Sequence, residues 1–201
     1  MDPELPTSPL LVRFFAEHPW SVVAPLLLVG AALAWYGARN DRIRLVMAGV
    51  AALLLAAGTL VSAAMWRSPG EHAAEAIRQL VAHAEAGDVA GVWSSFGSDA
   101  TIHYGTREAP GFELADIRRA AESLAAHNRI ESNTVTELGF ATIDDDTAEV
   151  MLGCRTTTHS SYVPIVTRWW MQVRRQPDGR WLIERMAFLQ FGNQRPSRGT
   201  I

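Results

Sequence analysis

The chain has 201 residues, a formal net charge of -3 and a single cysteine. Proteins that bind DNA or RNA ordinarily gather positive charge to replace the counterions of the phosphates, so this balance argues against a nucleic-acid partner. Cys154 cannot form a disulfide within the chain, and no second cysteine can join it in a metal site.

Two uncharged stretches near the N-terminus, residues 20–36 and 45–66, separate an apolar part of the chain from a charged part. At about 1.5 Å per residue, the second stretch is long enough to cross the hydrocarbon core of a bilayer, which is about 30 Å thick. The sequence therefore predicts two transmembrane helices, 20–36 and 45–66, which follow an N-terminal tail, 1–19.

The residue types in these stretches suit membrane helices in two respects. Aromatic side chains at the ends fit the interfacial zone of a bilayer, and small residues inside would let the helices pack closely. The aromatic residues are Trp20, Trp35, Tyr36 and Trp66. The small residues are Gly30, Ala34, Gly49, Ala52, Ala56 and Gly58.

Two other interpretations of the apolar part are a buried helical hairpin in a soluble core and a cleaved signal peptide. A small domain could not cover two helices that are apolar on every face. A signal peptide begins with a basic segment, whereas Asp2, Glu4 and Glu17 outnumber Arg13 before the first stretch.

The connection between the two stretches, GARNDRIR at residues 37–44, holds three arginines, against Arg13 and Arg67 just outside the spans. Positively charged loops stay on the cytoplasmic side of a membrane. We therefore expect a multi-pass protein of a bacterial inner membrane, with loop 37–44 in the cytoplasm and the C-terminal domain outside it.

The rest of the chain reads as helices followed by strands. Helical spacing and turn residues predict helices at 71–86, 89–96 and about 113–127, with a strand at 99–104 between the last two. Four strands follow within 131–191, separated by turns at 144–146, 158–161 and 176–179. This order predicts an α+β domain with helices on one face of a curved antiparallel sheet, followed by a disordered tail, 193–201.

The segment IRQLVAHAEAGDVAGVWSSFGSDATIHYG resembles the opening of the nuclear transport factor 2-like superfamily, which includes SnoaL-like polyketide cyclases and ketosteroid isomerases. The matching features are the helix break at Gly87 and Asp88, the aromatic Trp93, and the Asp-Ala-x-Ile strand that begins at Asp99. DGRWLIERMAF resembles the last hairpin of the family. The resemblance covers residues 71–192 and implies a cystatin-like cone of three helices on a curved sheet, with a pocket at its open end.

The resemblance also allows a test for ketosteroid isomerase chemistry, which needs a carboxylate base and an oxyanion hole of Tyr and protonated Asp. Carried across by these motifs, the three positions fall on Tyr104, Leu80 and Arg168. A phenol is a poor base at neutral pH, and leucine donates no hydrogen bond. We therefore expect a domain without this chemistry and without a cofactor.

Alternation along the last two strands predicts the lining of the cone, with Arg168 taken as inward-facing. The expected ligand-binding residues are Tyr104, Arg168, Trp170, Glu184, Met186 and Phe188. An amphipathic small molecule would suit this lining. The alternative is that Arg168 and Glu184 satisfy each other beside a packed aromatic core.

The opposite face of the sheet is expected to be apolar too, and a second subunit packed sheet to sheet would cover it as a homodimer. The residues assigned to that face are Trp169, Met171, Val173, Trp181, Ile183 and Leu189. His103 alternates away from Tyr104 and is expected to lie on the surface or to be satisfied by hydrogen bonds. The histidines and Asp144 to Asp146 lack the spacing of metal ligands, so no metal site is expected.

Two functions remain open at this stage. The first is a membrane-tethered, non-catalytic module that binds a small amphipathic ligand or serves in assembly. The second is a SnoaL-like isomerase, cyclase or dehydratase for an apolar substrate, using Tyr104, Arg168 and Glu184, with Glu184 holding a proton in an apolar pocket.

Overall fold

The computed structural model describes residues 5–7, 20–65, 67–113, 130–159 and 163–197, with five further positions between 115 and 126. The chain divides into two compact units. One unit is Ser8–Ser68, which contains the helices α2 and α3. The other combines Met1–Thr7 with Pro69–Ile201 and contains α4, α5 and the β-sheet.

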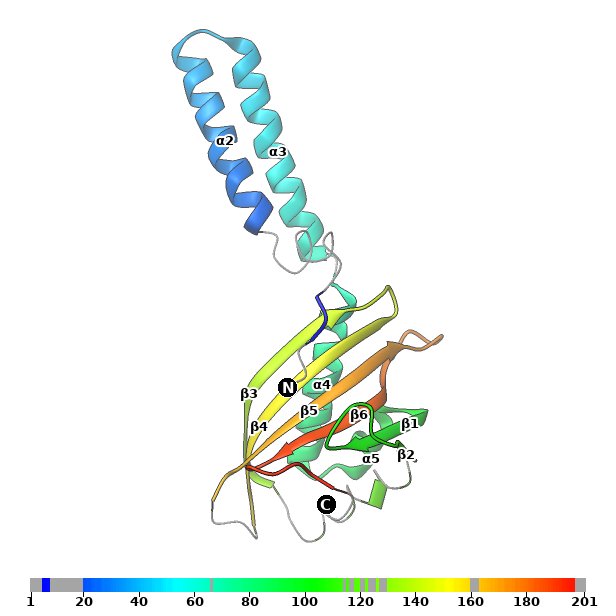
Figure 1. Ribbon diagram of the computed structural model, residues 1–201. Helices are drawn as coiled ribbons and strands as arrows, with labels where there is room; N and C mark the ends of the chain where they lie inside the picture. Colours follow the sequence, from blue (N-terminus) through cyan, green and yellow to red (C-terminus); the bar gives the residue numbers. More distant parts are fainter. Residues whose placement is uncertain are drawn as a thin grey trace. The chain divides into compact units, whose positions relative to one another are not determined.

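The first unit is a helical hairpin of α2, Trp20–Arg39, and α3, Ile43–Met65 (Figure 1). Both helices are longer at the loop end than predicted, because the connection is a tight turn. The turn is closed by a hydrogen bond from the Arg42 amide to the Gly37 carbonyl, with an N···O distance of 2.9 Å. Both helices are long and apolar enough to cross a membrane, over Trp20–Arg39 and Ile43–Val61.

Small residues bring α2 and α3 close together, as predicted. A Cβ added to Gly30 would lie 3.0 Å from the Gly49 carbonyl oxygen, and one added to Gly37 would lie 2.7 Å from the Val46 amide nitrogen. Ala56 is fully buried. Gly58 differs from the prediction, because a Cβ added there would meet nothing within 4 Å.

The remaining surface of the hairpin is apolar and exposed. In the most apolar 18-residue stretch of each helix, only 17% is buried in α2 and 11% in α3. Large side chains at least 50% exposed lie along both helices: Trp20, Leu28, Val29, Trp35, Tyr36, Ile43, Met47, Leu54, Leu55 and Val61. A buried helical hairpin would not leave so much apolar surface uncovered.

The second unit contains two helices and a six-stranded sheet (Figure 1). The helices are α4, Pro69–Ala86, and α5, Val89–Ser94. The strands are β1, Phe96–Tyr104; β2, Phe112–Glu113; β3, Ile130–Thr142; β4, Thr147–Thr158; β5, Ile165–Arg175; and β6, Trp181–Phe191. The order across the sheet is β2-β1-β6-β5-β4-β3, so the meander predicted for residues 131–191 is confirmed.

The prediction of a purely antiparallel sheet is wrong at one junction. β1 pairs with β6 in parallel, with Ile102 opposite Met186 and Tyr104 opposite Phe188. The other neighbouring strands pair antiparallel. Tight turns force antiparallel pairing only between consecutive strands of the meander, and a long stretch of chain separates β1 from β6. The unit is therefore α+β with a mixed sheet.

Helix α4 lies along one face of this sheet, which we call the inner face (Figure 1). Its buried residues Ala73 and Ile77 join the main core cluster. The strands contribute alternate residues to the same cluster: Ala148, Val150, Leu152 and Cys154 from β4, and Met171 and Val173 from β5. A second, smaller cluster of Met151, Trp170 and Ala187 lies on the opposite side, the outer face.

Two predicted segments are described only in part. The helix predicted at 113–127 is wrong at its start, because Glu113 lies in strand β2; residues 115, 118, 119, 122 and 126 are described, and they are helical. The other positions from 114 to 127 lie outside the described residues. In the predicted tail, described residues extend to Ser197; Gln194 bridges to Phe191, and Pro196 is buried.

Candidate functional site

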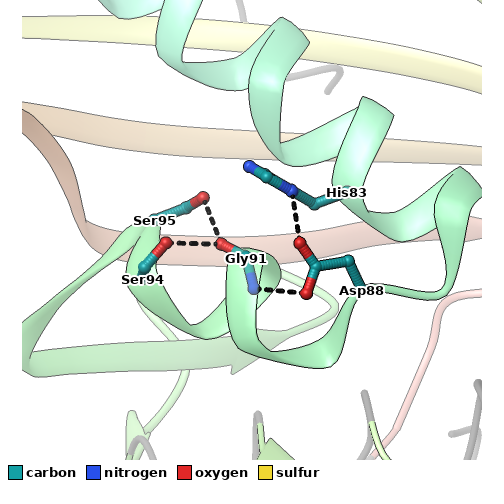
Figure 2. A network of polar contacts seen from close by, with 5 residues as sticks. All are labelled: His83, Asp88, Gly91, Ser94 and Ser95. Atoms are coloured by element: carbon teal, nitrogen blue, oxygen red, sulfur yellow. Dashed lines mark hydrogen bonds and ion pairs between the residues drawn. The ribbon is translucent and has the colours of Figure 1, made fainter.

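A polar network holds together the junction between α4 and α5, which leads into β1 (Figure 2). Asp88 is the N-cap of α5, and its Oδ1 accepts a hydrogen bond from the Gly91 amide at 2.9 Å. Asp88 Oδ2 lies 2.9 Å from Nδ1 of His83 on α4. The Gly91 amide, followed by His83, holds the pKa of the Asp88 carboxyl below its ordinary value.

Aromatic side chains gather on the inner face of β1, β2, β5 and β6, and we call this group the aromatic wall. Trp169 and Phe188 stack with ring centroids 4.0 Å apart and planes 9° apart. Tyr104 meets Phe112 edge to face at 5.6 Å, and Phe191 meets Phe188 in the same manner at 6.0 Å. The wall is therefore a group of apolar rings, one pair stacked and two pairs edge to face, with one phenol at its side.

The six predicted ligand-binding residues do not form one group. Tyr104, Met186 and Phe188 lie on the inner face, since Met186 and Tyr104 pack in the main core and Phe188 stacks on Trp169. Trp170 belongs to the outer cluster instead. Arg168 alternates with Trp169 and therefore shares the outer face with Trp170.

The contact between Arg168 and Glu184, which was the alternative to a ligand site, is absent. Arg168 forms an ion pair with Glu137 of β3, with an N···O distance of 3.1 Å. Glu184 lies 3.5 Å from a guanidinium nitrogen of Arg174. Neither charged group converges with Tyr104, so the three residues proposed for an enzyme are apart. Whether any of the six binds a ligand stays a prediction.

The error in facing has a local cause. Because side chains alternate, taking Arg168 as inward-facing moved every β5 residue to the wrong face. In β6 the pairing also skips a residue, since Val173 lies opposite Ile183 and Gln172 lies opposite Arg185. Glu184 occupies this bulge, which lets Ile183 and Met186 face the same core although their spacing is odd.

The residues expected on the outer face are corrected for the same reason. Met171, Val173 and Ile183 are buried in the main core on the inner face, and Trp169 and Trp181 pack beside them. Only Leu189 joins the outer cluster. The outer face of β5 instead carries Arg168, Trp170, Gln172 and Arg174, so the apolar-face argument for a homodimer no longer applies.

A polar cluster that the sequence analysis missed covers Trp170 on the outer face. The Trp170 indole N–H donates to Glu149 Oε2 at 2.9 Å, and Arg107 donates to the same oxygen at 3.2 Å. The guanidinium carbons of Arg107 and Arg185 lie 5.1 and 5.4 Å from the Trp170 ring centroid. Arg185 also donates to the Arg107 carbonyl at 3.0 Å, which fastens the loop after β1 to the sheet.

Both ring nitrogens of His103 lie within hydrogen-bond distance of a partner, which is one of the two predicted outcomes. Its ring is 7% exposed, its Nδ1 lies 2.6 Å from the Ala109 carbonyl oxygen, and its Nε2 lies 3.1 Å from Thr101 Oγ1. It stands opposite Ala187 on the outer face, away from Tyr104. His103 therefore fastens the loop after β1 rather than facing the aromatic wall.

Cys154 is buried in the main core, and burial raises the pKa of its thiol. Its sulfur lies 4.0 Å from the side-chain nitrogen of Asn133. Within the described part of the chain, no three His, Cys, Asp or Glu side chains gather as a group that could hold a metal ion.

No protein-family model and no curated protein matches this sequence. Solved structures with a similar fold include a nuclear transport factor 2-like protein of unknown function from Pseudomonas putida, which is 14% identical with a TM-score of 0.48. The alignment covers 57% of this chain and 80% of that one. A ketosteroid isomerase-like protein from Erwinia carotovora is 15% identical with a TM-score of 0.45, over 58% of this chain and 92% of that one.

A conserved protein from Planctomyces limnophilus is 19% identical with a TM-score of 0.44, over 56% of this chain and 88% of that one. With identities and TM-scores this low, these similarities carry no argument about the chemistry of this chain. The class that its own described residues define is an α+β domain with a mixed six-stranded sheet, joined to two apolar helices.

Proposed function

We propose that this protein is a membrane-anchored, nuclear transport factor 2-like domain that binds a small apolar molecule against the aromatic wall without catalysis. The domain assignment is supported by the order of elements: a long helix, the break at Gly87 and Asp88, a short helix, a strand, and a final meander. The observation that carries the ligand proposal is the aromatic wall itself.

The membrane anchor is supported by the exposed apolar surface of α2 and α3 and by the place of the N-terminal segment. Leu5, which precedes α2, packs against Met151, Trp170 and Ala187 in the domain that follows α3. Both flanks of the hairpin therefore belong on one side of a bilayer. Two crossings satisfy this condition, whereas a single crossing does not.

The absence of catalysis is proposed from the chemistry of the inner face. The titratable side chains that the described residues place beside the main core include Cys154, Tyr104 and His72, whose ring stacks on Trp181 with centroids 5.7 Å apart. Glu184, the carboxylate predicted to line this surface, pairs instead with Arg174 at 3.5 Å. A general acid–base pair needs two groups within hydrogen-bond reach of one substrate.

The SnoaL-like enzyme, which was the alternative, needs Tyr104, Arg168 and Glu184 around one substrate. Arg168 lies on the outer face with Glu137, so it cannot act from the same side as Tyr104 unless β5 changes register. We therefore favour binding over catalysis.

The ligand proposal is tested on the full chain, purified in mild detergent and transferred to nanodiscs, by native mass spectrometry of small molecules that remain bound. Trp169→Leu removes the stack on Phe188 while keeping an apolar side chain, and we expect it to reduce bound ligand at least about fivefold, since an aromatic stack contributes about 1 kcal/mol. Val166→Ala, on the exposed outer face of the same strand, is the control. Equal retention in both variants would rule out the aromatic wall as the site.

The anchor and its orientation are tested in cells. The chain is expected to remain in the membrane fraction after alkaline carbonate extraction. Alkaline phosphatase fused after Ile201 is expected to be active, because the domain is proposed to lie outside the cytoplasm. A fusion to a fluorescent protein that folds only in the cytoplasm would then be dark; a bright fusion would reverse the orientation.

A further inference from the structure

Three guanidinium groups surround the turn between α2 and α3. Arg39 ends α2, Arg42 lies in the turn and Arg44 is in the first turn of α3, and all three residues are exposed. Within the described part of the chain, none of the three side chains has an acidic partner. Asp41 is the one acidic residue in this segment, so an excess of positive charge remains.

The backbone keeps these groups together on a short, closed turn. The Asn40 side chain donates to the Tyr36 carbonyl at 2.8 Å, and the Arg42 amide donates to the Gly37 carbonyl at 2.9 Å. Asp41 has a positive φ of 53°, which closes the turn in few residues. The three arginines thus form one basic patch, which we call the basic turn (residues 39–44).

The residues beside the basic turn indicate where it lies in a bilayer. Trp35 and Tyr36 are 70% and 51% exposed near the end of α2, and Ile43 is 68% exposed at the start of α3. Exposed indole and phenol rings favour the boundary between hydrocarbon and headgroups. Guanidinium groups about one helical turn beyond these rings would lie at the level of the lipid phosphates.

We propose that the basic turn binds the phosphate groups of anionic phospholipids at the membrane surface. This inference rests on the proposed membrane anchor. Each guanidinium can donate two parallel hydrogen bonds to one phosphate, and unpaired arginines near an anionic surface each favour binding by about fivefold. The attraction is electrostatic, so added salt weakens it.

The test uses the full chain in nanodiscs that contain equal amounts of phosphatidylglycerol and phosphatidylcholine. Native mass spectrometry then identifies the lipids that stay bound when the protein is released from the nanodisc. We expect the bound lipid to be enriched in phosphatidylglycerol at least about fivefold over the bilayer. The variant R39Q/R42Q/R44Q should bring this ratio to about one, because the charge attraction is removed. The control R174Q/R175Q/R180Q removes the same charge from β5 and the turn after it, and should leave the ratio unchanged.

A second variant keeps the test decisive if the triple change impairs insertion. Asp41→Asn removes the one negative charge and keeps a side chain that tolerates a positive φ, so enrichment of phosphatidylglycerol should rise. Sodium phosphate and sodium chloride at equal ionic strength should lower enrichment equally. A greater effect of phosphate would show that the turn prefers the free ion and would overturn the lipid proposal.

The outcomes separate this inference from the function on which it rests. A chain that stays in the bilayer but shows no lipid preference, or a preference that is unchanged in both variants, refutes the basic turn as a headgroup site alone. A chain that alkaline carbonate releases from membranes refutes the anchor itself.

Discussion

Asp88 Oδ2 lies 2.9 Å from His83 Nδ1, and this contact joins the end of α4 to the N-cap of α5 (Figure 2). The Ser94 and Ser95 hydroxyls both donate to the Gly91 carbonyl, at 2.8 and 3.1 Å. The chain reverses here at Gly87, which has a positive φ of 69°. The direction in which β1 enters the sheet is therefore set by a few polar contacts beside one glycine.

Gly91→Ala is expected to destabilise the domain. A Cβ at this position would overlap His83 Nδ1 and Asp88 Oδ2, so the N-cap network could not keep its geometry. Both overlapping atoms end partly exposed side chains that can swing away, so the expected cost is the loss of the Asp88 cap and of its contact with His83, offset in part by better helix propensity. The midpoint of thermal unfolding, followed by near-UV circular dichroism in mild detergent, measures the change.

Gly97→Ala in β1 is the matched control, because its nearest contact would be the Ile183 carbonyl oxygen at an ordinary 3.7 Å. In a His83→Ala background, Gly91→Ala should cost less, since one of the two overlapping side chains is gone. Equal costs in both backgrounds would contradict the contact.

The charge of Asp88 should make stability depend on pH in the acidic range. Because the folded protein holds this pKa below its ordinary value, the carboxylate stabilises the fold above the unfolded pKa of about 3.9 and loses that contribution as pH falls through the lower folded value. Asp88→Asn can still cap α5 but carries no charge. The stability gap between wild type and D88N should therefore be constant at neutral pH and close below about pH 4; a gap that widens with acid would contradict the assignment.

Glu149→Ala should destabilise the domain by about 2 kcal/mol, since it leaves both the Trp170 indole N–H and the Arg107 guanidinium without their shared acceptor in a site that is largely buried. Glu137→Ala removes the ion-pair partner of Arg168. Because Glu137 is more exposed than Glu149, this change should cost less than about 1 kcal/mol. Chemical denaturation followed by tryptophan fluorescence compares the two variants. A larger loss in E137A than in E149A would contradict the outer-face cluster.

Cys154 should react slowly with a thiol reagent such as iodoacetamide in the folded protein. Burial hides its sulfur and raises its pKa, so little thiolate is present at neutral pH. Mass spectrometry over time should show that unfolding in urea speeds the reaction at least about a hundredfold, because reaction then follows the unfolded population. Rapid labelling without denaturant would place Cys154 outside the core.

Most of the fold was predictable because its signals are local. The helix break at Gly87, the turns before β4 and β6, and the apolar runs of α2 and α3 each depend on a few neighbouring residues. The parallel pairing of β1 with β6 was not predictable in this way. It depends on how distant parts of the chain close around the core, which no local pattern records.

The candidate site was harder to predict because it depends on side-chain facing. The run Trp169, Met171 and Val173 is apolar at every second position, and this pattern alone would have turned these residues toward α4. The family resemblance led us to take Arg168 as inward-facing, and this shifted the predicted facing of every β5 side chain by one residue. The bulge at Glu184 could not be predicted from the sequence, because one extra residue in a strand has no characteristic residue pattern.

The contact of Leu5 with Met151, Trp170 and Ala187 has a consequence for biosynthesis. The ribosome makes Leu5 before strands β4, β5 and β6, which carry its contacts, so its binding surface is complete only after β6 has been synthesised. Leu5 therefore cannot dock on this surface until β6 has been synthesised. Docking of Leu5 would then follow completion of the sheet, and a bulky group attached beside Leu5 would interfere at that step.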